Sequence, residues 1–238
     1  MQRPNKIVVV ITGDPVPTVL ERRGDYAAMM RAAIGEAWTG EYAAVDARTE
    51  SLGADLEGAA IVITGSSSNV HTREDWMLRA EARLRELEAA HAPVLGICFG
   101  HQLMAQAYGG EVRPNPKGRE ISTVEVEALA DDPLLADVGR IFTANACHSD
   151  TVATLPLHTE VLARSAVDDH QILRFGRRSW GVQFHPEFDG EVIRHYLDAR
   201  AEAVVSEGLD LAALKRRATD TPDARVVFRN FVRHVARD

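Results

Sequence analysis

The segment PVLGICFGHQL, residues 93–103, contains the pattern best suited to covalent chemistry. Cys98 stands between Gly96 and Gly100, after an apolar run typical of a buried strand and before a helical segment. This G-x-C-x-G order is the thiol counterpart of the nucleophile elbow, in which a tight, strained turn presents the nucleophile at the carboxyl end of a strand. The N-terminus of the following helix favours the thiolate. We expect a nucleophile, although the pentapeptide alone is also compatible with a small buried residue at a tight corner.

A thiolate nucleophile needs a base, and the base needs an orienting group. His101 is near in sequence, but its place on the first helical turn predicts that its side chain points away from Cys98. We therefore interpret it as structural. His185 follows the apolar strand WGVQF and precedes Pro186, which ends the strand because it lacks an N–H donor. Glu187, two residues after His185, can hold one ring nitrogen while the other faces the thiol, which predicts a triad of Cys98, His185 and Glu187.

The elements that position these residues alternate along the N-terminal half of the chain. Apolar, β-branched runs predict strands over 7–12, 42–46, 60–64 and 93–97. Helical patterns cover 26–37, capped by Asp25, and 72–91, capped by Thr72, and another helix starts near Gly100. This order predicts an α/β fold with an open, doubly wound and mostly parallel sheet, flanked by helices on both faces.

The C-terminal half has a different pattern. The alternation EISTVEVE, residues 120–127, is typical of a half-exposed antiparallel strand. Further short strands are predicted over 141–144, 161–165, 171–175 and 180–184, and helices over 190–205, 210–218 and 223–236. We expect a small antiparallel extension of the sheet and one domain over residues 1–238, with a core of about 6–200 and a C-terminal helical extension of about 201–238.

Composition narrows the classes of function. The chain carries 27 basic and 35 acidic residues, a net charge of −8, which argues against a broad nucleic-acid or anionic-membrane surface. No segment approaches the ~18 consecutive apolar residues of a membrane span. Without an export signal, the two cysteines suggest free thiols and a cytoplasmic location, and a bridge between Cys98 and Cys147 is disfavoured. No paired Cys or His spacing indicates a metal, and no G-x-G-x-x-G follows a strand, so no cofactor is expected.

The motifs GICFGHQLMAQAYGGEV and WGVQFHPEF together resemble those of the class I, triad-type glutamine amidotransferases. The chain looks most similar to stand-alone members related to the glutaminase half of GMP synthase. The resemblance implies that Cys98 attacks the γ-amide of glutamine and forms a γ-glutamyl thioester. It further implies that His185 carries the proton to the leaving ammonia and that Glu187 orients His185.

The same resemblance implies roles around the triad. An oxyanion hole would use the backbone N–H of Phe99 and, from the loop TGSSSNV, the N–H of Ser66. Gln102 matches a residue that contacts the bound glutamine. The segment CHSD matches one that lines the same pocket through backbone groups of Ser149 and Asp150.

Two departures from the family pattern bear on function. The loop that usually reads Gly-Gly-Pro has Gly65, Ser66 and Ser67 here, so the donor at Ser66 requires a backbone conformation open to residues other than glycine. No synthetase domain or P-loop follows in this chain, so any ammonia acceptor is a separate partner.

His148, in CHSD, would have a structural role at the pocket wall.

Three hypotheses follow. The first is a cysteine-dependent amidase acting on glutamine or a γ-glutamyl compound, with transfer to a partner and plain γ-glutamyl hydrolysis both open. The second is a catalytically quiet regulatory subunit with the same fold, suggested by the Ser-rich loop and the missing synthase. The third, an α/β-hydrolase with a cysteine nucleophile, is disfavoured because the carboxylate here follows the histidine by two residues.

Overall fold

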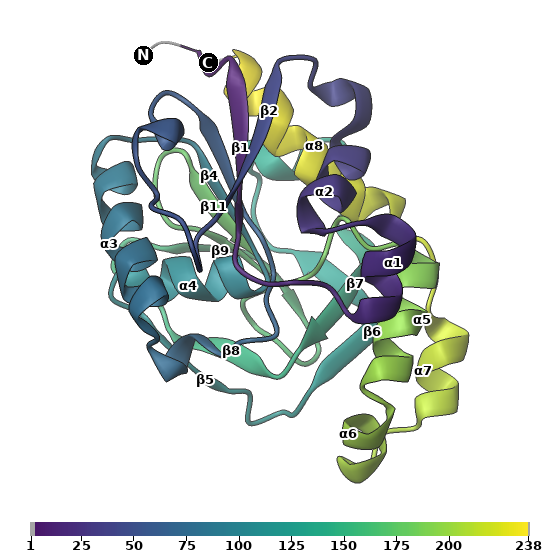
Figure 1. The fold of residues 1–238 in the computed structure, drawn as a ribbon. Coiled ribbons are helices and arrows are strands. Elements are labelled where there is room, and N and C mark those ends of the chain that lie inside the picture. Colours follow the sequence, from purple (N-terminus) through teal and green to yellow (C-terminus); the bar gives the residue numbers. More distant parts are fainter. Residues whose placement is uncertain (1–2, 238) are drawn as a thin grey trace.

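A nine-stranded mixed sheet forms the centre of the molecule, and the computed structural model describes residues 3–237 (Figure 1). In chain order the strands are β1 (Lys6–Ile11), β2 (Glu41–Asp46), β3 (Ala60–Ile63), β4 (Val94–Ile97), β5 (Glu111–Pro114), β6 (Glu120–Ala128), β7 (Ile141–His148), β8 (Asp150–Thr154), β9 (Glu160–Ser165), β10 (Ile172–Arg174) and β11 (Ser179–Val182). The α-helices are α1 (Pro17–Arg23), α2 (Tyr26–Ile34), α3 (Asp75–Ala89), α4 (Phe99–Ala107), α5 (Gly190–Ala199), α6 (Ala201–Ser206), α7 (Leu211–Arg217) and α8 (Pro222–Arg237).

The strand order of the main sheet is β2-β1-β3-β4-β11-β10-β9-β6-β7. The strands from β2 to β11 run parallel, and β10, β9, β6 and β7 continue the sheet in antiparallel fashion. Strands β5 and β8 form a separate antiparallel pair. The predicted α/β fold class, with its antiparallel part, is confirmed. Because β3, β4 and β11 are neighbouring parallel strands, the segments that follow them meet at one edge of the sheet.

Helices cover both faces of the sheet (Figure 1). Successive strand side chains point to opposite faces. Ile7 and Val9 of β1 therefore pack in one core cluster with α2 and α8, whereas Val8 and Val10 pack in another with α3 and α4. Figure 1 also shows α5, α6 and α7 gathered at one end of the molecule, where α5 and α7 contact β6.

Several element boundaries differ from those expected. The helix predicted over 72–91 begins at Asp75, because Arg73 adopts a left-handed conformation with φ 54°. Thr72 therefore does not cap it and instead donates its hydroxyl to the carbonyl of Asn69. The cap predicted at Asp25 is confirmed, since its carboxylate accepts the N–H of Ala28 at 2.8 Å.

Further differences lie around the predicted helices and the second sheet. The helix expected over 26–37 ends at Ile34 and continues as a 3-10 turn, and the helix expected over 190–205 is divided at Arg200. Strand β6 is buried from Glu120 to Val124, rather than half-exposed, because α5 and α7 pack against it. The sequence patterns did not reveal α1, β5 or β8. Within residues 3–237, no helix has both the length and the hydrophobicity needed to cross a bilayer.

Candidate active site

Cys98 lies on a strained turn between β4 and α4. Its φ of 50° and ψ of −102° place it in a region that L-amino acids rarely adopt. A Cβ added to Gly96 would lie 2.5 Å from the carbonyl carbon of Gly100, and one added to Gly100 would lie 2.6 Å from the carbonyl oxygen of Ile63. Both glycines are therefore required by close backbone contacts, as expected for a nucleophile elbow.

His185 and Glu187 lie beside this turn. The Nδ1 atom of His185 is 2.7 Å from the carboxylate of Glu187, and the ring lies close enough to Cys98 for the two side chains to interact electrostatically. The imidazole stacks on Phe188 with ring centres 4.0 Å apart. A Cβ added to Gly65 would lie 2.7 Å from the Cε1 atom of His185. The structure thus brings the three predicted triad residues together and leaves the imidazole little room to move.

The turn that carries His185 is fixed by Asn145, which the sequence patterns did not single out. The backbone N–H of His185 donates to the carbonyl of Asn145 at 2.8 Å. The side-chain amide of Asn145 donates to the carbonyls of Phe188 and Thr219, each at 3.1 Å. In the sequence, Asn145 stands out only as a polar residue within the strand β7. Its position there does not indicate that it contacts the turn of His185.

The charges around His185 favour its protonated form. Burial lowers the pKa of the imidazole, but the carboxylate of Glu187 and the neighbouring Cys98 outweigh burial and raise the pKa to about 10. At neutral pH His185 is therefore an imidazolium with two N–H donors. One donor serves Glu187, and the other is available to Cys98.

His101 lies away from this cluster, as expected. A Cβ added to Gly181 would lie 2.4 Å from its Nδ1 atom, and its ring packs against Phe175. Burial lowers the pKa of His101 to about 3, so the ring stays neutral inside the core. Both Cys98 and Cys147 are free thiols.

The loop after β3 is tied to the elbow by backbone contacts. Thr64 accepts the N–H of Gly100 at 3.1 Å through its carbonyl, and the same carbonyl accepts the hydroxyl of Thr12 at 2.9 Å. Within residues 3–237, Ser66 is not among the non-glycine residues with positive φ. The Ser66 backbone packs closely against Gly13, since a Cβ at Gly13 would lie only 2.8 Å from the Ser66 Cα. The backbone at this position is thus open to serine.

A pocket of about 180 Å³ opens above Cys98. The predicted oxyanion and substrate-binding residues all line it: Ser66, Phe99, Gln102, Ser149 and Asp150. In the described part of the chain, the N–H groups of Ser66 and Phe99 donate to no other group. They are available to a ligand.

Gln102 has a more internal role than expected. Its side-chain nitrogen donates to the carbonyl of Asp150 at 3.1 Å and to the Gln183 side chain at 3.0 Å. Both amide hydrogens are therefore engaged within the protein, and only the amide oxygen is open to a ligand.

His148 forms part of the pocket wall through a buried ion pair. Its Nε2 lies 3.0 Å from the carboxylate of Glu120, and its Nδ1 lies 2.9 Å from the carbonyl of Asp150. Although burial opposes the charged form, the contacts with Glu120 and Asp168 raise the pKa of His148. Two acceptors around one ring favour the imidazolium, which holds the Asp150 backbone in place. No group of three or more His, Cys, Asp or Glu side chains in residues 3–237 is arranged to hold a metal ion.

Two arginines in the pocket escaped the sequence patterns. Arg119 forms an ion pair with Glu207 at 2.8 Å. Arg200, at the break between α5 and α6, lines the same pocket, and its side chain has no hydrogen-bond or ion-pair partner in the described part of the chain. A cation left open beside Cys98 can bind an anionic group of a substrate. No sequence pattern pointed to this role, because the break in the helix was not predicted.

Comparison with known proteins identifies the family of this chain. Residues 41–200 match the family model "Glutamine amidotransferase class-I". The chain belongs to the class-I glutamine amidotransferase family. It is 40% identical over 126 residues to a glutamine-hydrolyzing GMP synthase subunit of Methanothrix thermoacetophila, covering 50% of this chain and 67% of that protein. It is 31% identical over 142 residues to gamma-glutamyl peptidase 4 of Arabidopsis thaliana, covering 58% and 57%.

Other matches define the extent of the similarity. A GMP synthase of Phenylobacterium zucineum is 36% identical over 132 residues, which cover 54% of this chain but only 24% of that enzyme. The matched part of the chain thus covers between about a quarter and two thirds of the length of these relatives. A glutamine amidotransferase of Thermotoga maritima has the same fold, with a TM-score of 0.79 at 20% identity over 98% of this chain and 99% of that one.

Proposed function

We propose that this chain is a cysteine-dependent amidase that hydrolyses the γ-amide of glutamine, or of a related γ-glutamyl compound, through a γ-glutamyl thioester. The observation that carries the proposal is the set formed by Cys98 on its strained turn, His185 beside it, and Glu187 at 2.7 Å from the imidazole. Membership of the class-I glutamine amidotransferase family supports it.

In the first half-reaction, the Cys98 thiolate, stabilised by the His185 imidazolium, attacks the carbonyl carbon of the amide. A carbon–sulfur bond forms, and the carbonyl oxygen becomes an oxyanion. The N–H groups of Phe99 and Ser66 line the pocket and are free to donate to this oxygen. The carbon–nitrogen bond then breaks, and His185 gives its proton to the nitrogen, which leaves as ammonia.

In the second half-reaction, neutral His185 takes a proton from water as the water oxygen attacks the thioester carbonyl. The carbon–sulfur bond breaks, the γ-carboxylic acid is released, and the thiolate–imidazolium pair is restored. Glu187 holds the Nδ1 side of the ring throughout and stabilises its positive charge. His185 thus acts as an acid in the first half-reaction and as a base in the second.

Two versions of this reaction are compatible with the site: transfer of the ammonia to a partner protein, and hydrolysis of γ-glutamyl conjugates without transfer. Relatives named as GMP synthase subunits suggest that ammonia passes to a separate synthase protein. The similarity to a gamma-glutamyl peptidase favours a γ-glutamyl hydrolase acting on small conjugates. In either reaction Arg200 would bind a carboxylate of the substrate.

The test is a substrate panel of glutamine, glutathione and simple γ-glutamyl amides, with ammonia or free amine as the readout. We expect Cys98→Ala to lower turnover by more than about 10³-fold. Cys147→Ala is the matched control, since Cys147 is the other thiol of the same pocket and should leave turnover within a few-fold.

The outcome of the panel separates the hypotheses. Hydrolysis of small γ-glutamyl conjugates without a partner would favour the hydrolase, and weak release of ammonia from glutamine alone would favour a missing synthase partner. Unchanged turnover in Cys98→Ala would refute the mechanism. A wild-type protein that is inactive on all substrates and whose Cys98 resists a glutamine-like chloroketone would support the regulatory role instead.

A further inference from the structure

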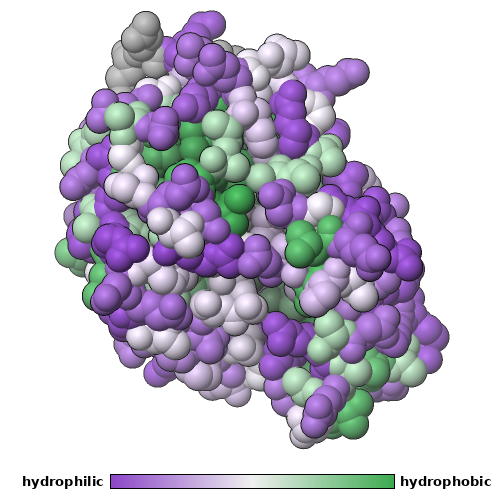
Figure 2. Space-filling view, viewed as in Figure 1, coloured by the Kyte–Doolittle hydropathy of each residue, from purple (hydrophilic) through white to green (hydrophobic). Residues whose placement is uncertain are grey.

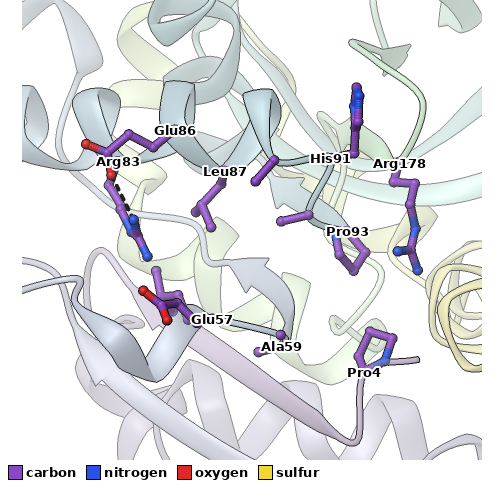
Figure 3. Close-up of a pocket in the computed structure, with 13 residues that line it drawn as sticks. Pro4, Glu57, Ala59, Arg83, Glu86, Leu87, His91, Pro93 and Arg178 are labelled. Atoms are coloured by element: carbon purple, nitrogen blue, oxygen red, sulfur yellow. Dashed lines mark hydrogen bonds and ion pairs between the residues drawn. The ribbon is translucent and has the colours of Figure 1, made fainter. Parts of the chain in front are cut away.

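A second pocket lies at the end of the sheet opposite Cys98, before the first residues of several strands. Figure 3 draws the residues that line it. Its volume is about 440 Å³. Four of its residues stand just before strands: Pro4 before β1, Ala59 before β3, Pro93 before β4 and Arg178 before β11. Because these strands are parallel, the four residues meet at the amino-terminal edge of the sheet. The end of α3 completes the wall.

Arg178 is the unusual residue of this pocket. It is only 6% exposed, yet its Nε and Nη2 atoms are buried with no hydrogen-bond partner among the described residues. Its carbonyl accepts the N–H of Val94 at 2.9 Å, so the sheet fixes its backbone. By contrast, Arg174 on the neighbouring strand pairs with Asp132 at 3.4 Å. A buried, unpaired charge is costly, so an anion beside the guanidinium of Arg178 would stabilise it.

The charges of the pocket are arranged asymmetrically. Figure 3 shows Arg83 and Arg178 at opposite ends, with Leu87 and Pro93 between them. Arg83 is compensated, since it pairs with Glu86 at 2.7 Å, and a second glutamate, at position 57, also lines that end. Among the described lining residues, uncompensated positive charge is therefore confined to the Arg178 end, and the space between the two ends is apolar.

We propose that this pocket binds a small molecule with one anionic head group, a carboxylate or a phosphate monoester, and an apolar body. The head group pairs with Arg178, whose planar guanidinium matches both groups. The body lies over Leu87, Ala59 and Pro93. The two acidic residues at the far end disfavour a second anionic group. The volume is within the range of about 300–1,000 Å³ that small-molecule sites occupy.

Calorimetric titration of the full chain with three ligands of equal chain length tests this site: hexanoate, hexyl phosphate and hexan-1-ol. We expect at least one anion to bind at least tenfold more tightly than the alcohol, and the tighter anion identifies the head group. Arg178→Met should lose this preference. Because it removes a buried unpaired charge, it should melt at the same temperature as the wild type or higher. A merely structural arginine would instead give a lower melting temperature.

A second pair of variants keeps the test valid if Arg178→Met does not fold. Ala90→Glu adds an acid to the exposed rim of the pocket and should weaken anion binding several-fold, whereas Ala89→Glu, which is outside the pocket, should not. The site is refuted if neither anion binds the wild type in the millimolar range, or if both glutamate variants and Arg178→Met bind as the wild type does. Turnover is expected to be unchanged in Arg178→Met, so this outcome is independent of the catalytic proposal.

Discussion

The two ends of the same parallel strands hold very different pockets. At the carboxyl-terminal edge, β4 and β11 lead to Cys98 and His185, and charged groups there form pairs, His185 with Glu187 and Arg119 with Glu207, whereas Arg200 has no partner among the described residues. At the amino-terminal edge, the residues before the same strands line a largely apolar pocket, in which Arg178 has no partner among the described residues. On the face drawn in Figure 2, hydrophilic side chains predominate, and apolar ones show in a hollow of the upper half and on the surface at the lower right, where α6 and α7 lie.

Under the two proposals one sheet serves two purposes, amide hydrolysis at one edge and anion binding at the other. The catalytic edge depends on geometry, because close glycine contacts, a strained turn and a stacked imidazole fix each reacting atom. At the amino-terminal edge, the proposed binding of an anion depends on Arg178, which has no partner among the described residues and lies beside an apolar surface. Changes at the catalytic edge should therefore alter turnover and leave anion binding at the other edge unchanged, and any variant that alters both would show that the two ends are coupled.

Glu187→Gln should have the largest effect. Glutamine keeps the size of the side chain but removes the negative charge that stabilises the His185 imidazolium, so turnover should fall by about 10³- to 10⁴-fold. Steady-state rates measure the loss, with hexanoate titration as the control for the other edge. A loss of less than tenfold would show that Glu187 does not orient the base.

The same variant should change how stability depends on pH. In the wild type the pKa of His185 is raised to about 10, so its charged form stabilises the fold fully below about pH 6.5 and this stabilisation is lost as pH rises toward 10. Without the Glu187 carboxylate that pKa falls. Urea unfolding at pH 7 and pH 10 should therefore show a smaller decline in Glu187→Gln than in the wild type. An equal decline would assign the pH dependence to other groups.

Gly65→Ala should come next, with a loss of about 10²-fold. Its new methyl group would lie 2.7 Å from the Cε1 atom of His185 and must displace the ring. Misplacing a catalytic group by about 1 Å has a cost of this order. Gly53→Ala is the matched control, because Gly53 has no atom within 4 Å of the added Cβ and no positive φ. Turnover equal to that of the control would show that the ring has room to move.

Much of the catalytic edge was predictable because local sequence determines it. The order of strand, glycine-flanked cysteine and helix predicts the turn at Cys98, and a proline after a strand predicts the turn at His185. The exclusion of His101 also followed from local geometry, since the first turn of a helix sets its direction. In the structure Cys98 lies on a turn with positive φ after β4, and His185 lies 2.7 Å from Glu187.

What the sequence could not predict depends on contacts between distant segments. Asn145 fixes the turn of His185 from another strand, and Arg200 reaches the pocket only because the helix breaks at that residue. Arg178 is one of two adjacent arginines in a hairpin, and nothing nearby in the sequence shows that its guanidinium is buried without a partner among the described residues. Which hydrogen-bond and ion-pair partners a side chain has can therefore be read only from the folded structure.

Arg200→Gln should have the smallest effect and separates substrate binding from chemistry. Arg200 lines the pocket at Cys98 and has no partner among the described residues, so it should bind a substrate carboxylate before and during the reaction alike. Removing a contact made equally in both states raises KM without lowering kcat. We expect KM to rise about tenfold, as for the loss of one charged hydrogen bond. Arg119→Gln is the matched control, with a smaller change in KM, because Glu207 already holds that guanidinium. If kcat falls while KM stays constant, Arg200 acts on the reacting groups, and a missing partner in the structure is then not enough to identify an arginine as a simple anion receptor.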